Sequence, residues 1–299
     1  MMKSRRTLSA VLAAMTAAGM LYAMPVGLAA EQTAPAMPET QVSAPVTQTE
    51  DAKPFAIVRQ GKKWGAVTPT GALAIPAEYD EITSYSADAL AVRQGKNWGI
   101  IRLDGTVIVP IAYKTIHPMS GDMIVVVDAK DNYGAYNTGG SLILPAEYKY
   151  ISPFNDGIAK VMRKDKKDVF YRSDGSLLSD ATYDAAQPFS EGLAAVKTSN
   201  GKYGFIDRAG TMVIPAAYDW ADSFMEGLCV VEVKKKYGFI DKNGTMVIAP
   251  QLRAKQMRGF HDGLAMVKEK KHWAFIDKSG KVVFETRYED VEPFENGLA

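Results

Sequence analysis

The sequence predicts an all-β protein built from seven tandem β-meander repeats of about 35 residues, and three observations support this prediction. One position, here called the anchor, recurs at spacings of 34 to 36 residues and is aromatic in six of seven copies. A glycine stands seven residues after every anchor. The intervening segments are short runs of β-branched and aromatic residues without a helical period. A fixed period of this size is typical of propellers and solenoids.

Three repeat positions define the units. The anchors are Trp64, Trp98, Tyr133, Asp168, Tyr203, Tyr237 and Trp273. In five units a glycine follows the anchor directly, and these are Gly65, Gly99, Gly134, Gly204 and Gly238. Such a glycine inside a strand indicates a bulge or a close backbone approach. The glycines seven residues after the anchor are Gly71, Gly105, Gly140, Gly175, Gly210, Gly244 and Gly280. They indicate tight turns, because glycine readily adopts positive φ.

Each unit is predicted to contain three strands followed by a connector, as the fifth unit illustrates. Residues 193–196, 203–206 and 211–214 have strand composition and are separated by polar turns. Pro215 is predicted to end the third strand, and the connector after it has room for a short fourth strand. Because meanders this short are barely stable alone, neighbouring units are expected to bury one another's apolar faces.

Seven such units can close into a propeller-like ring or continue as an open, curved β-solenoid. Seven copies suit a propeller, whereas about 35 residues is short for a four-stranded blade. The ring-like arrangement is slightly preferred. The sequence stops at Ala299, where a further first strand would begin. This end is compatible with ring closure and with a truncated last unit.

The N-terminal segment predicts export. Residues 1–30 have a basic start, an apolar run and a small-residue cleavage site, as a signal peptide does. The alternatives are an uncleaved anchor helix and, because of Arg5 and Arg6, a twin-arginine signal in place of a simple basic start. Residues 31–53 are rich in Pro and Thr and predict a disordered linker, and residues 54–299 form the repeat domain. The expected location is the periplasm, the cell surface or the extracellular medium.

Composition excludes some classes of function. Removal of residues 1–30 takes away three cations and changes the formal net charge from +1 to about −2, which argues against nucleic-acid binding. The lone Cys229 cannot form an internal disulfide and is predicted to be a buried strand residue.

The motifs KKWGAV, KNWGII, GKYGFID and KKYGFID are each followed by a turn glycine, an Ile/Val-Pro pair and Tyr-Asp or a related pair. Over residues 54–299 the chain resembles the WG-repeat family, also called KWG repeats. The resemblance implies a bacterial exported or surface protein with no catalytic residue common to the family. The fourth unit departs from the pattern: it loses the aromatic anchor, the following glycine and, at Asp180, the proline. It is either a decayed spacer or a specialised patch.

No motif predicts catalysis, a metal or a cofactor. His117, His261 and His272 share neither a repeat offset nor a metal-ligand spacing. No nucleophile elbow, phosphate loop or zinc-helix motif is present in the sequence. Asp207 and its equivalents Asp241 and Asp277 precede the turn glycine, and capping of the turn explains them better than calcium does.

Charge gives the one positive indication of a binding surface. Lysines recur in the hairpin turn before each anchor and are expected to form a basic rim, whereas acids recur before a glycine at the unit boundary. The candidate binding residues are Lys62, Lys63, Lys96, Lys166, Lys167, Lys202, Lys234, Lys235, Lys236, Lys270 and Lys271. The acids are Asp156, Glu191, Glu226 and Asp262. The simpler alternative is that these lysines are solvated and prevent edge pairing.

These observations predict a non-catalytic repeat module that mediates binding or scaffolding at the cell envelope. The expected partner is a protein or an anionic glycan of the envelope, with no nucleic acid and no membrane contact except through residues 1–30 if they are uncleaved. The alternative is a propeller-type hydrolase of envelope glycans or peptides, with acids from several units in one pocket. A purely structural envelope component is a third reading.

Overall fold

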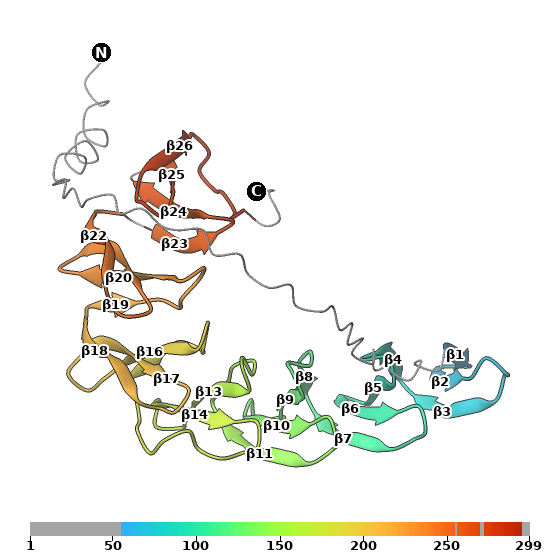
Figure 1. Cartoon of the computed structure of the whole chain (residues 1–299). Helices are drawn as coiled ribbons and strands as arrows, with labels where there is room; N and C mark the ends of the chain where they lie inside the picture. Colours follow the sequence, from blue (N-terminus) through green and yellow to red (C-terminus); the bar gives the residue numbers. More distant parts are fainter. Residues whose placement is uncertain (1–54, 255, 270–271, 295–299) are drawn as a thin grey trace, which may run out of the picture. The chain divides into compact units, whose positions relative to one another are not determined.

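The computed structural model describes residues 55–254, 256–269 and 272–294. Within these ranges every regular element is a β-strand, and the strands form seven antiparallel sheets that follow one another in chain order (Figure 1). The prediction of an all-β chain of seven units is confirmed. Among these residues there is no helix long and apolar enough to cross a membrane. The predicted signal peptide (1–30) and linker (31–53) lie outside the described residues.

The strands of the first four sheets are as follows. Sheet 1 contains β1 (Ala56–Gln60), β2 (Lys63–Val67) and β3 (Leu73–Tyr79). Sheet 2 contains β4 (Glu81–Ser84), β5 (Ala89–Gln94), β6 (Asn97–Arg102) and β7 (Val107–Tyr113). Sheet 3 contains β8 (Thr115–Ile116), β9 (Met123–Val127), β10 (Tyr133–Asn137) and β11 (Leu142–Tyr148). Sheet 4 contains β12 (Tyr150–Ile151), β13 (Ile158–Met162) and β14 (Asp168–Arg172).

The last three sheets have four strands each. Sheet 5 contains β15 (Ala185–Ala186), β16 (Leu193–Lys197), β17 (Tyr203–Asp207) and β18 (Met212–Tyr218). Sheet 6 contains β19 (Trp220–Ala221), β20 (Leu228–Val233), β21 (Lys236–Asp241) and β22 (Met246–Leu252). Sheet 7 contains β23 (Gln256–His261), β24 (Leu264–Glu269), β25 (His272–Ile276) and β26 (Val282–Thr286).

The connector supplies the short fourth strand that the sequence left room for. In sheet 6, β19 follows directly after β18 of sheet 5 but pairs with β20, through Trp220↔Glu232 and Ala221↔Val231. Each connector therefore leaves its own sheet and becomes the first strand of the next one. In the four-stranded sheets the anchor strand is the third of four, so both of its neighbours come from its own repeat.

The third strand of a unit does not end at its proline, so that prediction is wrong. In sheet 5, β18 continues through Pro215 as far as Tyr218. This is possible because β18 is an edge strand and Pro215 is exposed, so the missing N–H breaks no bond within the sheet. The pairing also shifts twice, from Ile206↔Met212 to Phe205↔Ile214 and then to Tyr203↔Tyr218.

The glycine after the anchor is required by a close backbone approach, as predicted. A Cβ on Gly204 would lie 2.6 Å from the Ile214 carbonyl oxygen and 2.7 Å from the Ala216 nitrogen. Sheet 7 has Ala274 at this position, and there the strands stay in step through Ala274↔Glu285 and Phe275↔Phe284. The glycine therefore permits the shift in register between anchor and third strand.

The predicted turns are also confirmed. All seven glycines at the later position have φ between +79° and +91°. Gly210 N–H donates to the Asp207 carbonyl oxygen at 2.9 Å, and the Asp207 carboxylate accepts from the N–H groups of Ala209 and Thr211. Asp241 and Asp277 accept equivalent bonds, so these aspartates cap turns.

The apolar cores lie between neighbouring sheets. The Phe205 and Phe224 rings are fully buried, with centroids 5.1 Å apart, in a cluster that joins sheets 5 and 6. Equivalent clusters join each of the remaining five pairs of consecutive sheets. Cys229 is a free, buried member of the same cluster, as predicted, and burial raises the pKa of its thiol. The expectation that units bury one another's apolar faces is confirmed.

The fourth unit keeps these cores but loses its third strand. Isolated bridges Asp168↔Tyr183 and Tyr171↔Leu177 replace it. Asp168, at the anchor position, is 3% exposed; its Oδ2 accepts from Ala186 N–H at 2.8 Å and lies 3.5 Å from Lys160 Nζ. Burial raises the pKa of Asp168, an effect that Lys160 opposes.

Because the Gly204 backbone lies against β18, we expect Gly204→Ala to lower the free energy of unfolding by about 1–3 kcal/mol, the usual cost of overpacking. The matched reverse change, Ala274→Gly, meets no such backbone contact in sheet 7 and should cost at most about 1 kcal/mol. Urea denaturation of both variants measures the difference. Equal losses would contradict the role given to this glycine.

Candidate functional site

The hairpin turns that precede the anchors carry the predicted basic residues. Lys62 and Lys96 are exposed in sheets 1 and 2, Lys166 in sheet 4, and Lys234 and Lys235 in sheet 6. None of these five side chains forms an ion pair with a described residue. Lys236 lies next to this turn at the start of β21 and is half-buried. Lys270 and Lys271 lie outside the described residues.

Three other predicted lysines are already paired within the protein. Lys63 Nζ lies 2.8 Å from Asp80 Oδ1, and Lys167 and Lys202 pair in the same way with Asp184 and Asp219. Lys63, followed by the N–H of Gly95, holds the pKa of Asp80 below its usual value. The predicted rim is therefore interrupted, and its unpaired charge is concentrated at particular turns, with two exposed lysines in sheet 6.

The aspartates of these pairs also connect neighbouring sheets. Asp80 Oδ2 accepts from Gly95 N–H of sheet 2 at 2.7 Å, and Asp219 Oδ2 accepts from Lys234 N–H of sheet 6 at 2.6 Å. This role of the aspartates was not predicted from the sequence. The available signal was the recurrence of a Tyr-Asp pair with a lysine 17 residues before the aspartate.

The unit-boundary acids lie at the opposite end of the sheets. Each of these acids precedes a glycine and has φ between +48° and +53°; they are Asp156, Glu191, Glu226 and Asp262. Glu191 Oε2 accepts from Gly227 N–H at 3.0 Å and lies 2.9 Å from Lys242 Nζ, both in sheet 6. Glu226 makes the equivalent contacts with Gly263 and Lys278 of sheet 7. We call these contacts the turn staples.

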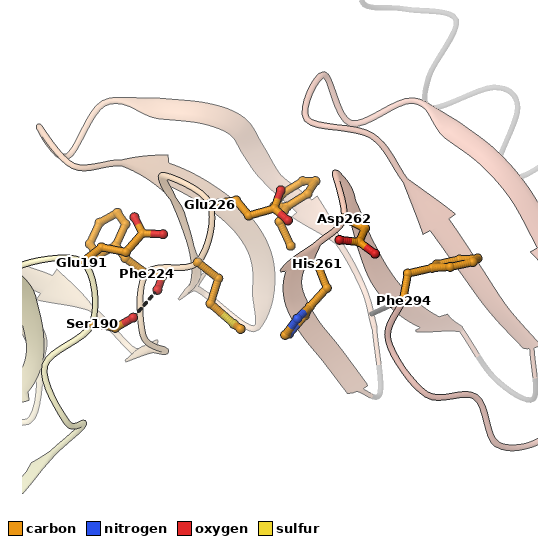
Figure 2. Close-up of a pocket in the computed structure, with 9 residues that line it drawn as sticks. Ser190, Glu191, Phe224, Glu226, His261, Asp262 and Phe294 are labelled. Carbon is orange, nitrogen blue, oxygen red and sulfur yellow. Dashed lines mark hydrogen bonds between the residues drawn. The ribbon is translucent and has the colours of Figure 1, made fainter. Parts of the chain in front are cut away.

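A pocket of about 370 Å³ opens beside these turns (Figure 2). Glu191, Glu226 and Asp262 line it from three successive repeats, together with His261 and the Phe224 and Phe294 rings. Burial alone would raise the pKa of Glu191, but Lys242 and the Gly227 N–H reverse this and hold it below its usual value. An ionised carboxylate occupied in this way cannot donate a proton as a general acid.

A second cleft, also of about 370 Å³, lies where sheet 6 meets sheet 7. Its lining residues are Trp220, Glu232, Tyr237, Gln256, Met257 and Arg258. Of these residues, only Tyr237 was predicted from the sequence, as a structural anchor. The sequence signal for this cleft is Glu232, which lies opposite the anchor at the position where four other units have arginine or lysine.

One histidine packs against an anchor aromatic. The His117 ring stacks on Tyr133, with centroids 5.9 Å apart. Within the described ranges, no group of three or more His, Cys, Asp or Glu side chains is arranged to hold a metal ion. The stacking on Tyr133 gives His117 a packing role at an anchor residue.

A family model described as "WG containing repeat" matches residues 64–98, 98–128, 133–167, 170–203, 203–237, 237–271 and 273–299. Comparison with curated proteins finds no match. Among solved structures, the chain is similar to BamB from Moraxella catarrhalis, with 9% identity and a TM-score of 0.40 over 78% of this chain and 85% of that one. It is also similar to Kluyveromyces lactis Hsv2 with its complete loop 6CD, with 13% identity and a TM-score of 0.41 over 66% and 73% of the two chains.

The turn staple of Glu191 predicts a pH dependence of stability. Since its pKa is lowered in the folded state, its contribution is present above its unfolded pKa and is lost as the pH falls through the folded pKa. We expect Glu191→Gln to cost about 0.5–1 kcal/mol of unfolding free energy at pH 7, and the difference from the parent protein to shrink toward pH 3. Denaturation at pH 7, 5 and 3 measures it.

The exposed Glu147 provides the control, because Glu147→Gln removes a carboxylate that holds no neighbouring sheet. The variant should match the parent protein at each pH. A Glu191→Gln difference that stayed constant down to pH 3 would contradict the ionic part of the staple.

Proposed function

We propose, since the chain belongs to the WG-containing repeat family, that it is an exported, non-catalytic module that binds or scaffolds a partner at the cell envelope. The repeat architecture supports an interaction role, because stacked units present a long surface whose turns can vary while the cores stay constant. Export is proposed from residues 1–30, and residues 31–53 would act as a tether. The location would be the periplasm, the cell surface or the extracellular medium.

The observation that carries this proposal is the backbone conformation of the turn in sheet 6. Lys234 and Lys235 have φ of +52° and +62°, where glycine or asparagine would be less strained. The first turn residue in sheets 1 and 2 is indeed a glycine, Gly61 and Gly95, with φ of +62° in each. Two lysines held at an energetic cost, exposed and without an acidic partner, indicate that their charge is used.

The chemistry of these turns fits an anionic partner. Unpaired ammonium groups at a rigid turn attract carboxylate, sulfate or phosphate groups over a Debye length and bind them as point charges. We propose an anionic glycan of the envelope or an acidic protein surface as the partner. The paired lysines Lys63, Lys167 and Lys202 would contribute less, because each already neutralises an aspartate.

One observation favours the second candidate, a hydrolase of envelope glycans or peptides. The pocket in Figure 2 brings together carboxylates from three repeats. Two of these carboxylates are engaged in the turn staples, however, which favours a structural role for them. Release of products from purified envelope glycan or peptide, abolished by Glu226→Gln, would support the hydrolase and contradict the non-catalytic proposal.

Removal of the two strained lysines tests the binding proposal. We choose Lys234→Asn with Lys235→Asn, because asparagine tolerates positive φ and the turn should keep its shape. Two exposed charge contacts contribute about 0.4–2 kcal/mol together, so affinity for heparin, a soluble polyanion used as probe, should fall about 2-fold to 30-fold and depend less on salt. Binding is measured by titration at several salt concentrations.

The control variant removes two exposed lysines outside the hairpin turns that precede the anchors, Lys149→Asn with Lys281→Asn. It changes net charge by the same amount and should bind heparin as the parent protein does. Equal losses in both double variants would mean that net charge alone governs binding, and would contradict a site at this turn.

A further inference from the structure

Most anchor aromatics are covered by a cation from the strand next to them. In four sheets an arginine or lysine stands directly opposite the anchor, with its charge 4.9 to 5.9 Å from the ring centroid. The pairs are Arg59 over Trp64, Arg93 over Trp98, Lys197 over Tyr203 and Lys268 over Trp273. The repeat therefore supplies its own cation to an aromatic face, an arrangement that attracts because the face of the ring is negative.

Sheet 6 reverses this charge. Glu232 stands opposite the anchor Tyr237, and on its other side it stands opposite Trp220. The two rings lie nearly perpendicular, with centroids 6.3 Å apart. No described residue forms an ion pair with Glu232. A carboxylate without an ion-pair partner among the described residues thus stands opposite two aromatic residues, and burial followed by the nearby charge of Glu232 raises the pKa of Tyr237.

A cleft lies next to Glu232 and the two aromatic rings. The cleft of about 370 Å³ separates these residues from Gln256, Met257 and Arg258 on β23 of sheet 7. Arg258 Nη1 lies 2.9 Å from Glu292 Oε2, so its charge is compensated outside the ladder of Trp220, Glu232 and Tyr237. The uncompensated charge of the cleft is therefore that of Glu232.

We propose that this cleft binds the basic side chain, arginine or lysine, of a partner protein, which takes the position that the repeat's own cation has in the other sheets. Two aromatic rings and one carboxylate lining the same cleft match the charge of a guanidinium or ammonium group. The volume lies at the lower end of the range for ligand sites and suits one side chain. This site goes beyond the proposed anion-binding turns and has the opposite charge preference.

The neighbouring lysines act against this binding. Lys234 and Lys235 form the turn of the hairpin that carries Glu232 and Tyr237. They repel any approaching cation, and their repulsion is strongest for a ligand that remains outside the cleft. A long, flexible basic side chain on a partner surface can pass them and place its charge in the cleft beside Glu232.

A direct test uses the full chain and a capped tripeptide, acetyl-Gly-Arg-Gly-amide. Its citrulline analogue has nearly the same shape without the charge. The indole N–H signal of Trp220 in nuclear magnetic resonance spectra, assigned with Trp220→Phe, reports binding at the cleft. We expect a saturable shift with the arginine peptide, and at least about fivefold weaker binding of the citrulline peptide. Equal binding of the two peptides would overturn the proposal.

Two further probes separate other ligands. Tetramethylammonium tests whether a small free cation binds better than a side chain, and tighter binding of it would overturn the assignment to a protein partner. N-acetylglucosamine tests for a neutral sugar, and a Trp220 shift with this sugar alone would assign the cleft to a glycan and overturn the proposal.

The matched variant is Glu232→Lys, which recreates in sheet 6 the Lys197–Tyr203 pair of sheet 5. Because sheet 5 already contains this pair, the variant should fold with unchanged urea midpoint and lose at least about tenfold in affinity for the arginine peptide. A folded Glu232→Lys variant that still binds normally would overturn the proposal. Lys234→Asn with Lys235→Asn should strengthen peptide binding at least about twofold, and a weakening would count against the site. Heparin binding is scored separately, so failure of one site leaves the other test intact.

Discussion

The structure depends on burial between one sheet and the next. A sheet of three or four short strands has two faces and cannot cover either by itself, so an aromatic pair such as Phe205 and Phe224 must be enclosed by residues of both neighbours. All six junctions use the same kind of apolar cluster. The polar contacts follow from this stacking: once the cores fix the distance between sheets, Asp219 and Glu191 can reach backbone N–H groups of sheet 6 at the two ends.

What could be predicted from the sequence is what each repeat specifies locally. A glycine that must adopt positive φ, or an aspartate two residues before the N–H groups it caps, is visible in one copy, and seven copies make it unmistakable. The extent of β18 could not be predicted in the same way, because a proline interrupts a central strand but not an edge strand. The Lys202–Asp219 pair and the second cleft depend on strand register and on the meeting of two sheets, which local patterns do not reveal.

Recurring and non-recurring charges have different uses in this chain. Some recurring charges are occupied in contacts within or between sheets: the glutamates of the turn staples, and the lysines that stand 17 residues before a Tyr-Asp aspartate. The hairpin lysines Lys62, Lys96 and Lys166 recur as well, but they form no ion pair with a described residue. Two residues that depart from the pattern, Lys234 in its strained turn and Glu232 opposite the anchor Tyr237, likewise form no ion pair with a described residue. Asp168 departs as well, but it is buried inside the fold, where Lys160 and a backbone N–H contact its Oδ2 and its Oδ1 has no hydrogen-bond partner among the described residues. Departure from the repeat is therefore informative about binding where the charged group is also accessible from outside the fold.

The equivalence of the junctions bears on how such a chain changes over generations. Glu191 contacts sheet 6 through the same atoms that Glu226 uses for sheet 7, so at these two junctions one kind of surface ahead meets the same complement behind. A copy added by gene duplication meets suitable surfaces on both sides without a new interface having to evolve, and a copy removed by recombination leaves its neighbours able to join. The fourth unit shows how tolerant this inheritance is: it has lost its anchor ring and third strand, yet its neighbours remain joined through it.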